Sequence, residues 1–298
     1  MTINDRIAVL GGDRRQLFLL RYLLERGYRV TSWGLGEEGR NLFPTYTAPT
    51  LEAALKEAHV LVLPFPVSVD GVRLRCPLEK EELSIRLSIL LDGFQGEQIL
   101  GGRLPEAFVH SMIPRGITPV DYATAEPLLL KNAMLTAEGA ISLAMEKLPV
   151  ALDGSCVAVI GYGRIGSLLA DRLRGLGAHV LVYARREASL TLASLCHHTP
   201  VALRCEEAYE CLKHLPSSCR VVFNTVPECL FSREVLAAYP KECLFVDLAS
   251  APGGLDRAAA DELGIPWIWG TALPGRYAPE SAGIALAQTV EHLLEARL

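Results

Sequence analysis

The chain has 298 residues, of which 50% are hydrophobic and 21% charged, and its formal net charge is −5. This length allows two domains, and this composition is typical of a globular protein rather than a disordered one. The small acidic excess gives no electrostatic support to a nucleic-acid-binding surface, so no nucleic-acid partner is expected.

Neither the N-terminal segment nor any hydrophobic run predicts a targeting or membrane-spanning sequence. The first apolar stretch is one strand long, ends at Gly11 and Gly12, and follows no basic segment. No window approaches the roughly 18 uninterrupted apolar residues of a membrane span. The 8 cysteines form no C-x-x-C pair and are expected to be reduced thiols, and the histidines show no ligand spacing. We therefore expect a cytoplasmic protein with no metal site and no membrane partner.

The first part of the chain alternates between strand and helix patterns. Apolar runs predict strands at 7–10, 30–33, 60–63, 108–110 and 117–120, and helical spacing predicts a helix over 17–24. Strands that alternate with helices indicate a parallel sheet covered on both faces. The stretch from Gly71 to Gly102 matches no pattern and is interpreted as a loop and helix that face a partner.

A long amphipathic helix is predicted over 128–148, ended by Pro149, and the strand–helix pattern then starts again. Its predicted elements are strands at 157–160, 179–184, 220–224, 244–248 and 267–269, and helices over 165–176 and 281–294. The predicted fold is α/β, with two Rossmann-like doubly wound domains joined by long helices. The predicted domains are residues 1–127 plus 279–298, which would be flavodoxin- or Rossmann-like and bind substrate, and residues 128–278, which would bind the cofactor and include the bridging helix.

The most informative motif is Gly161, Gly163 and Gly166, which form G-x-G-x-x-G between a predicted strand and a predicted helix. The first Gly allows a tight turn, the second lets a pyrophosphate approach the backbone, and the third lets the helix pack on the strand. Amides at the helix N-terminus then meet the phosphate. The motif predicts a dinucleotide site with contacts from Gly161, Gly163, Arg164, Ile165 and Gly166.

The end of the next strand determines the type of dinucleotide. NAD-preferring sites usually place Asp or Glu there to bind the ribose 2′-hydroxyl. This chain has Ala184, Arg185 and Arg186 instead, and two arginines can pair with a 2′-phosphate. NADP is therefore predicted, with NAD as the alternative; the arginines could also form a solvated loop.

The turn after the first strand is a candidate substrate site. It contains Gly12, Arg14, Arg15 and Gln16 but lacks a third Gly, so it is a poor dinucleotide site. It still places backbone amides and two arginines at a strand's carboxyl end, where open α/β sheets bind ligands. An anionic substrate is predicted here, against the alternative of solvated charges on a structural turn.

Further candidates lie at later strand ends and on the long helix. Each strand-end segment could also be a simple turn, and Glu138 could be a solvated helical carboxylate rather than a general acid or base. The candidate cofactor contacts are Asn224, Thr225, Val226, Pro227, Asp247, Ala249, Pro274 and Gly275, and Arg276 is a further candidate substrate contact. The candidate catalytic residues are Asn132, Thr136, Glu138 and Arg14.

In order along the chain, the segments IAVLGGDRRQ, NAMLTAEGAI, GYGRIG, NTVP, DLASAPGG and LPGRYAPESAG resemble the A subunit of dipicolinate synthase, an enzyme of endospore-forming bacteria. GYGRIG alone suits many hydroxyacid dehydrogenases, whereas DLASAPGG followed by LPG-x-x-AP-x-x-AG is more specific. The resemblance implies an NADP-dependent oxidation of a dihydrodipicolinate-type intermediate to pyridine-2,6-dicarboxylate. It also implies a dicarboxylate substrate, a partner in the form of a flavoprotein-like B subunit, and the mother cell of a sporulating bacterium as location. A homo-oligomer is expected.

Two other functions stay open. One is a 2-hydroxyacid dehydrogenase-like enzyme acting on another small acid, whose domain arrangement the predicted elements share. Such enzymes bring an Arg, a Glu and a late His to the site, and here the late histidine is His292, deep in the last predicted helix. The other is a non-catalytic NADP-binding subunit, which would not need polar strand ends.

Overall fold

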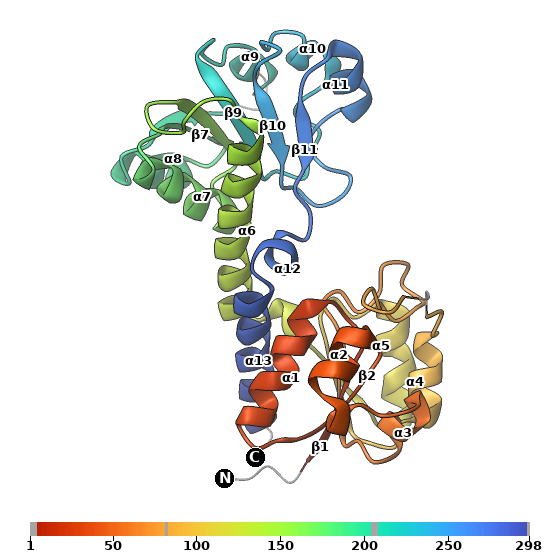
Figure 1. Ribbon diagram of the computed structural model, residues 1–298. Helices are drawn as coiled ribbons and strands as arrows, with labels where there is room; N and C mark the ends of the chain where they lie inside the picture. Colours follow the sequence, from red (N-terminus) through yellow and green to blue (C-terminus); the bar gives the residue numbers. More distant parts are fainter. Residues whose placement is uncertain (1–4, 81–82, 204–207, 297–298) are drawn as a thin grey trace. The chain divides into compact units, whose positions relative to one another are not determined.

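The computed structural model describes residues 5–80, 83–203 and 208–296. The chain divides into two compact units: unit 1 is residues 1–131 with 278–298, and unit 2 is residues 132–277. Helix α6 (Glu126–Lys147) begins in unit 1 and continues in unit 2 (Figure 1). The division therefore falls inside this helix, whereas the sequence pattern predicts it just before the helix.

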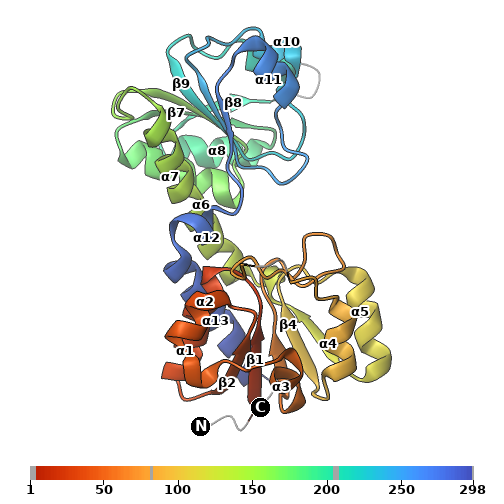
Figure 2. The same ribbon diagram turned by 45° about the vertical axis from the view of Figure 1, so that its right-hand side comes forward.

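Unit 1 is built on a parallel sheet whose described strands run in the order β2-β1-β3-β4-β5. Strands β1, β2 and β4 of this sheet are labelled in Figure 2. The chain moves from β1 to one side and then, at β3, to the other, so the topological switch point lies between β1 and β3. Open sheets bind ligands at such points, outside the carboxyl ends of the strands. The strands are β1 (Arg6–Leu10), β2 (Arg29–Trp33), β3 (Val60–Val62), β4 (Gln98–Gly101) and β5 (Thr118–Asp121).

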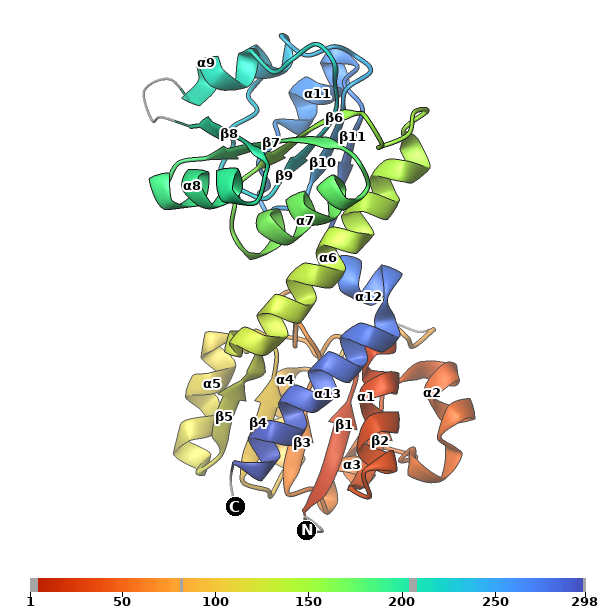
Figure 3. The same ribbon diagram turned by 90° about the vertical axis from the view of Figure 1, so that its left-hand side faces the viewer.

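Helices cover both faces of the unit 1 sheet. Helices α1 and α13 lie side by side on one face, where Leu20, Leu23 and Val290 are fully buried (Figure 3). Helices α3, α4 and α5 cover the other face. The helices of this unit are α1 (Arg14–Glu25), α2 (Gly36–Leu42), α3 (Leu51–Lys56), α4 (Leu87–Gly93), α5 (Glu106–Met112) and α13 (Pro279–Glu295), with short 3-10 turns η1 (Pro44–Tyr46), η2 (Ile113–Arg115) and η3 (Tyr122–Thr124).

Unit 2 contains a second parallel sheet, in the order β11-β10-β9-β6-β7-β8 among its described strands. Its switch point lies between β6 and β9. The strands are β6 (Cys156–Ile160), β7 (His179–Ala184), β8 (Thr199–Ala202), β9 (Cys219–Asn224), β10 (Leu244–Asp247) and β11 (Trp267–Trp269). The helices are α7 (Arg164–Gly175), α8 (Glu187–Leu195), α9 (Ala208–Lys213), α10 (Arg233–Leu236), α11 (Arg257–Leu263) and α12 (Leu273–Tyr277).

The unit 2 strands are apolar runs because both faces of the sheet are buried. Residues of α6, α7 and α8 pack on one face, and residues of α9, α10 and α11 pack on the other. Val157 and Val159 point to the first face and Ala158 and Ile160 to the second, because successive side chains of a strand point to opposite faces of the sheet. The predicted architecture of two parallel-sheet α/β parts is confirmed.

Three local predictions were wrong or incomplete. Phe108–His110 was predicted as a strand but lies in α5, where Phe108 and Met112 are buried at helical spacing. Strand β4 was missed because it is four residues long and starts at a polar Gln98. Strand β8 was missed because it is an exposed edge strand that contains Pro200.

Helix α6 is the one described helix whose length and mean hydropathy (1.2) match a membrane span, and 50% of the matching window is buried inside the protein. Core helices of soluble proteins give the same match. All seven cysteines in the described ranges are free thiols. Cys205 lies outside the described residues.

Candidate functional site

The Gly-rich turn of unit 2 links β6 to α7 and has an open side. Gly161 adopts φ +92°, a left-handed conformation that other residues rarely adopt, and its N–H donates to Tyr183 O at 2.8 Å. A Cβ on Gly166 would lie 2.1 Å from Gly161 O, so only Gly lets α7 start this close to the turn. A Cβ on Gly163 would meet no atom within 4 Å, and no side chain caps the helix there. The start of α7 is therefore uncapped by a side chain and open at Gly163, and helix N-termini with free amides commonly bind anions.

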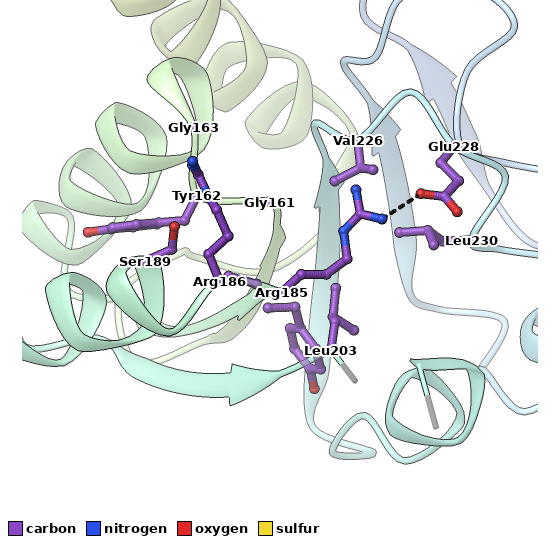
Figure 4. Close-up of a pocket in the computed structure, with 12 residues that line it drawn as sticks. Gly161, Tyr162, Gly163, Arg185, Arg186, Ser189, Leu203, Val226, Glu228 and Leu230 are labelled. Carbon is purple, nitrogen blue, oxygen red and sulfur yellow. Dashed lines mark hydrogen bonds and ion pairs between the residues drawn. The ribbon is translucent and has the colours of Figure 1, made fainter. Parts of the chain in front are cut away.

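A pocket of about 370 Å³ opens beside this turn, at the carboxyl ends of β7 and β9 (Figure 4). Arg185 Nη1 lies 3.1 Å from Glu228 Oε2, and both side chains are more than half exposed. The Arg186 side chain extends toward Gly163 in Figure 4 and makes no ion pair with another described residue. The residues that line the pocket are Gly161, Tyr162, Gly163, Tyr183, Ala184, Arg185, Arg186, Ser189, Leu203, Val226, Glu228 and Leu230. The pocket thus joins the Gly-rich turn to the two arginines.

Several residues of this pocket were not anticipated from the sequence. Glu228 directly follows the NTVP segment, so its position just beyond a strand was the one sequence feature that could have identified it as a site residue. Tyr162 packs edge to face on His198, with ring centroids 6.1 Å apart. His198 is buried, and neither ring nitrogen has a hydrogen-bond partner among the described residues. Burial lowers the His198 pKa, so the ring is neutral, whereas the neighbouring His197 is exposed.

Asn224 and Asp247, both predicted as cofactor contacts, are each 2% exposed and bind each other. Asn224 Nδ2 donates to Asp247 Oδ1 at 2.8 Å and to Val226 O at 3.0 Å. The Asp247 carboxylate also accepts the N–H groups of Ala249, at 3.2 Å, and Gly254, at 2.8 Å. These side chains have their hydrogen bonds inside the protein, so they shape the loops after β9 and β10 rather than face a ligand.

Other predicted cofactor residues lie in the loop after β9 and in α12. Thr225 Oγ1 donates to Ile160 O at 2.8 Å, which holds the loop after β9 against the Gly-rich turn. Pro274 and Gly275 are half-buried in α12, which packs against Gly139 of α6. Arg276 is exposed in the same helix, with its guanidinium carbon 5.7 Å from the Tyr277 ring centroid. Its predicted substrate contact stays a prediction.

The three candidates on α6 do not form one group. Thr136 Oγ1 donates to the backbone oxygen of Asn132 at 2.7 Å, and these two half-buried residues share a helix face at i, i+4. Glu138 points elsewhere: it is half exposed, and its Oε1 lies 3.3 Å from Arg172 Nε on α7. This geometry favours a surface ion pair for Glu138 over the predicted general acid or base.

The first Gly-rich turn, in unit 1, is covered by its own chain. The Gly12 N–H donates to Arg75 O at 2.7 Å, and a Cβ on Gly11 would lie 2.8 Å from the same oxygen. A Cβ on Gly11 would also lie 2.9 Å from Cys76 Sγ. Gly12 therefore offers no backbone donor to a substrate, which corrects the sequence-based expectation.

The two arginines after this turn have different environments. Arg14 is exposed and pairs with Glu38 at 2.9 Å. Arg15 is 9% exposed, binds both oxygens of Asp13 at 2.8 Å, and donates to the backbone oxygen of Phe65. Arg15 is thus an internal anchor, and the expectation that it faces a substrate is corrected.

The neighbours of Arg15 complete this arrangement. Burial raises the pKa of Asp13, but the hydrogen bonds and charges of Arg15 and Arg75 outweigh it and lower that pKa to about 2. Asp13 is therefore an ionised anchor and not a proton acceptor near neutral pH. Gln16 is 2% exposed, and its Nε2 has no hydrogen-bond partner in the described chain.

Comparison with known proteins matches both parts of the chain. Residues 6–123 match the family described as the N-terminal domain of the dipicolinate synthase A subunit. Residues 133–259 match the NAD binding domain of D-isomer specific 2-hydroxyacid dehydrogenases, which indicates a nicotinamide dinucleotide cofactor and an oxidoreductase.

Proteins that match almost the whole chain are also dipicolinate synthase A subunits. The dipicolinate synthase A subunit of Bacillus subtilis (strain 168) is 28% identical over 295 residues, 99% of this chain and 97% of the relative. The crystal structure of the dipicolinate synthase A subunit from Bacillus halodurans superposes with a TM-score of 0.84 at 25% identity, covering 99% of each chain. The crystal structure of the dipicolinate synthase A chain from Bacillus subtilis superposes with a TM-score of 0.83 at 27% identity, covering 100% of this chain and 99% of the Bacillus subtilis chain. The N-terminal family match, the dinucleotide turn and these relatives together show that the chain is similar, over almost its whole length, to dipicolinate synthase A subunits.

Proposed function

We propose that this protein oxidises a dihydrodipicolinate-type intermediate to pyridine-2,6-dicarboxylate, with NADP⁺ as the electron acceptor. The similarity to dipicolinate synthase A subunits over almost the whole chain supports the reaction. The observation that carries the choice of NADP is the end of β7: Ala184 stands there, followed by Arg185 and Arg186, and both arginines line the pocket beside the Gly-rich turn. A carboxylate at this strand end would favour the 2′-hydroxyl of NAD, and a cation favours the 2′-phosphate of NADP.

The residues of unit 2 fit a bound dinucleotide. The space over Gly163 and the uncapped start of α7, with Arg164 and Ile165, would receive the pyrophosphate. Arg186 would bind the 2′-phosphate, because Arg185 already pairs with Glu228. When bound, the nicotinamide accepts two electrons and one hydrogen from the substrate ring.

Unit 1, residues 1–131 with 278–298, would bind the substrate, and unit 2, residues 132–277, would bind NADP. The oxidation removes two hydrogens from the ring, one with its electron pair and one as a proton, and leaves an aromatic product. The protein's own part is to hold the two carboxylates and keep the ring away from water. Glu138 is paired with Arg172, so we assign it no proton transfer.

We further propose that a flavoprotein-like B subunit completes the enzyme, since the names of the relatives identify them as one lettered component of dipicolinate synthase. A homo-oligomeric A subunit in the mother-cell cytoplasm of a sporulating bacterium would fit this role.

The test is a coupled assay with purified protein, NADP⁺, dihydrodipicolinate synthase and its two substrates. We expect absorbance at 340 nm to rise as NADPH forms and pyridine-2,6-dicarboxylate to accumulate in equal amount. The variant Arg186→Gln should slow the NADP⁺ reaction and leave any NAD⁺ reaction unchanged. If no product forms, with or without the B subunit, the proposal is wrong.

The match to the 2-hydroxyacid dehydrogenase NAD binding domain favours one second candidate, a dehydrogenase acting on another small acid. Reduction of small 2-oxo acids by NADPH or NADH would identify that activity. Tight NADP⁺ binding without turnover in either assay would instead indicate the non-catalytic subunit.

A further inference from the structure

Three arginines meet at the switch point of the unit 1 sheet. Asp13 joins two of them, because its Oδ2 accepts from Arg15 Nη2 at 2.8 Å and from Arg75 Nη1 at 2.9 Å. Phe65 joins the third, since its ring centroid lies 5.6 Å from the guanidinium carbons of both Arg15 and Arg103. The loops after β1, β3 and β4 therefore bring three cations to one edge of the sheet.

The acidic groups in contact with this cluster do not neutralise it. Asp13 is shared between two arginines, and its oxygens accept the Arg15 N–H as well as three side-chain N–H groups. Asp121 is the other carboxylate, and it accepts the backbone N–H groups of Arg103, Leu104 and Ala123. Three cations against two saturated anions leave a positive balance, which favours an added anion.

The Arg75 side chain is partly buried, and some of its N–H groups make no hydrogen bond to another described residue. Its side chain is 22% exposed, and in the described chain only Nη1 of its guanidinium makes a hydrogen bond. The planar fork of arginine suits a carboxylate, which accepts two parallel N–H groups. Asp13 fixes one edge of this fork and leaves the rest to a ligand.

Arg103 is held in a backbone conformation that costs energy. Its φ is +55°, in the left-handed region that favours Gly. Two glycines directly precede Arg103 in the sequence, yet the left-handed position is occupied by the arginine. Asp121 stabilises this conformation by accepting the Arg103 N–H at 2.9 Å and the Leu104 N–H at 3.2 Å. The guanidinium itself makes no hydrogen bond to another described residue. Strain that a fold maintains around a polar side chain points to a functional role.

We propose that Arg75 and Arg103 bind the carboxylates of a small dicarboxylate at this edge of unit 1. The identity of the ligand rests on the proposed function, whereas the position and chemistry of the site rest on the cluster. In this view Arg15 and Asp13 form the fixed floor of the site. Arg75 and Arg103, neither of which belongs to a sequence motif, supply the contacts that the Gly12 amide cannot supply.

The experiment is calorimetric titration of the full-length protein and its variants Arg75→Gln, Arg103→Gln and Arg115→Gln. Arg115 is the matched control, an exposed unit 1 arginine paired with Asp92 at 2.9 Å. The probes are pyridine-2,6-dicarboxylate, the monocarboxylate pyridine-2-carboxylate, glutarate and NADP⁺. Glutarate keeps three atoms between its carboxylates, as the pyridine does, without the ring.

We expect Arg75→Gln and Arg103→Gln each to raise the Kd for the dicarboxylates by roughly 10- to 100-fold, the range for a lost charge-assisted contact. For at least one of these variants, the Kd for the monocarboxylate should rise less than the Kd for the dicarboxylates. The Kd for NADP⁺ should not change in either variant, and the Arg115→Gln protein should bind all probes as the wild type does. If Arg75→Gln lowers the Tm, Arg75→Lys keeps the cation without the fork and should still bind the dicarboxylates more weakly.

Failure of this inference can be told apart from failure of the proposed function. If the enzyme makes pyridine-2,6-dicarboxylate but both Gln variants bind dicarboxylates within twofold of wild type, the inference is wrong and the function stands. If no turnover occurs but dicarboxylate binding depends on these arginines, the function is wrong and the site stands. A wild-type protein that binds neither dicarboxylate overturns the inference.

Discussion

Replacing Gly166 by Ala should damage both the stability of unit 2 and its cofactor site. The new Cβ would lie 2.1 Å from Gly161 O and 2.9 Å from Gly161 C, and both are backbone atoms. Side-chain carbons essentially never approach closer than 3.0 Å, so α7 and the turn must separate by about 0.9 Å. Overpacking of this kind costs roughly 1–3 kcal/mol, which corresponds to a Tm lower by roughly 3–10 °C.

Substitutions of two other glycines in the same region separate the effect on stability from the effect on cofactor binding. A Cβ on Gly163 meets nothing within 4 Å, so Gly163→Ala should cost less than about 1 kcal/mol of stability but place a methyl group where the pyrophosphate approaches. Gly175 also has open space and lies at the end of α7, so Gly175→Ala should be neutral or slightly stabilising and leave the site intact.

The assay is thermal unfolding followed by circular dichroism, with NADP⁺ titration of each variant. We expect loss of stability and binding for Gly166→Ala, loss of binding alone for Gly163→Ala, and loss of neither for Gly175→Ala. A Gly166→Ala protein with the wild-type Tm would refute the packing argument. Wild-type NADP⁺ affinity in Gly163→Ala would refute the location of the pyrophosphate.

Three further predictions concern single side chains. Arg186→Gln should raise the Kd for NADP⁺ by roughly 10- to 100-fold and leave the Kd for NAD⁺ unchanged; equal changes for both would contradict a 2′-phosphate contact. Asn224→Ala leaves the buried Asp247 carboxylate without its amide donor and should lower the unfolding free energy by about 3 kcal/mol in urea titrations, whereas a change under about 0.5 kcal/mol would show the pair is dispensable. The pKa of Asp13 lies at about 2 in the fold against an ordinary value of 3.8, so its ionised form stabilises the protein above pH 4, and this contribution is lost as the pH falls toward 2. The unfolding free energies of wild type and Asp13→Asn should therefore converge by about 2 kcal/mol over that range, and a constant difference would argue against the Arg15 and Arg75 pairing.

Most of the fold could be predicted from the sequence because long elements leave periodic patterns. The strands around the G-x-G-x-x-G motif are buried on both faces, so they read as continuous apolar runs with glycine at their ends. The failures have local causes: FVH in α5 resembles a strand, and the four residues of β8 include a proline. Length alone does not separate success from failure, because the three-residue strands β3 and β11 were predicted from their apolar runs.

The site was predictable only where it is local in sequence. The dinucleotide turn and the arginines after β7 lie within one strand–helix–strand unit, and the pocket contains both. The pairing of Asp13 with Arg75 joins residues 62 positions apart, and the loop that covers Gly12 is equally distant from it. No local pattern signals such a contact. That is why Gly12 and Arg15 were expected to face a substrate, and why Arg75 was not considered.

The packing of α13 on α1 has a consequence for synthesis on the ribosome. Unit 2 is a continuous segment, so its core can assemble as soon as residues 132–277 have emerged. Unit 1 cannot close one face of its sheet until α13 follows, because Val290 and Leu294 fill the space beside Leu20 and Leu23. At typical elongation rates the N-terminal sheet therefore waits on the order of ten seconds or more with that apolar face uncovered. Chaperone binding to nascent chains should accordingly concentrate on α1 and β1, and end when the last helix is released.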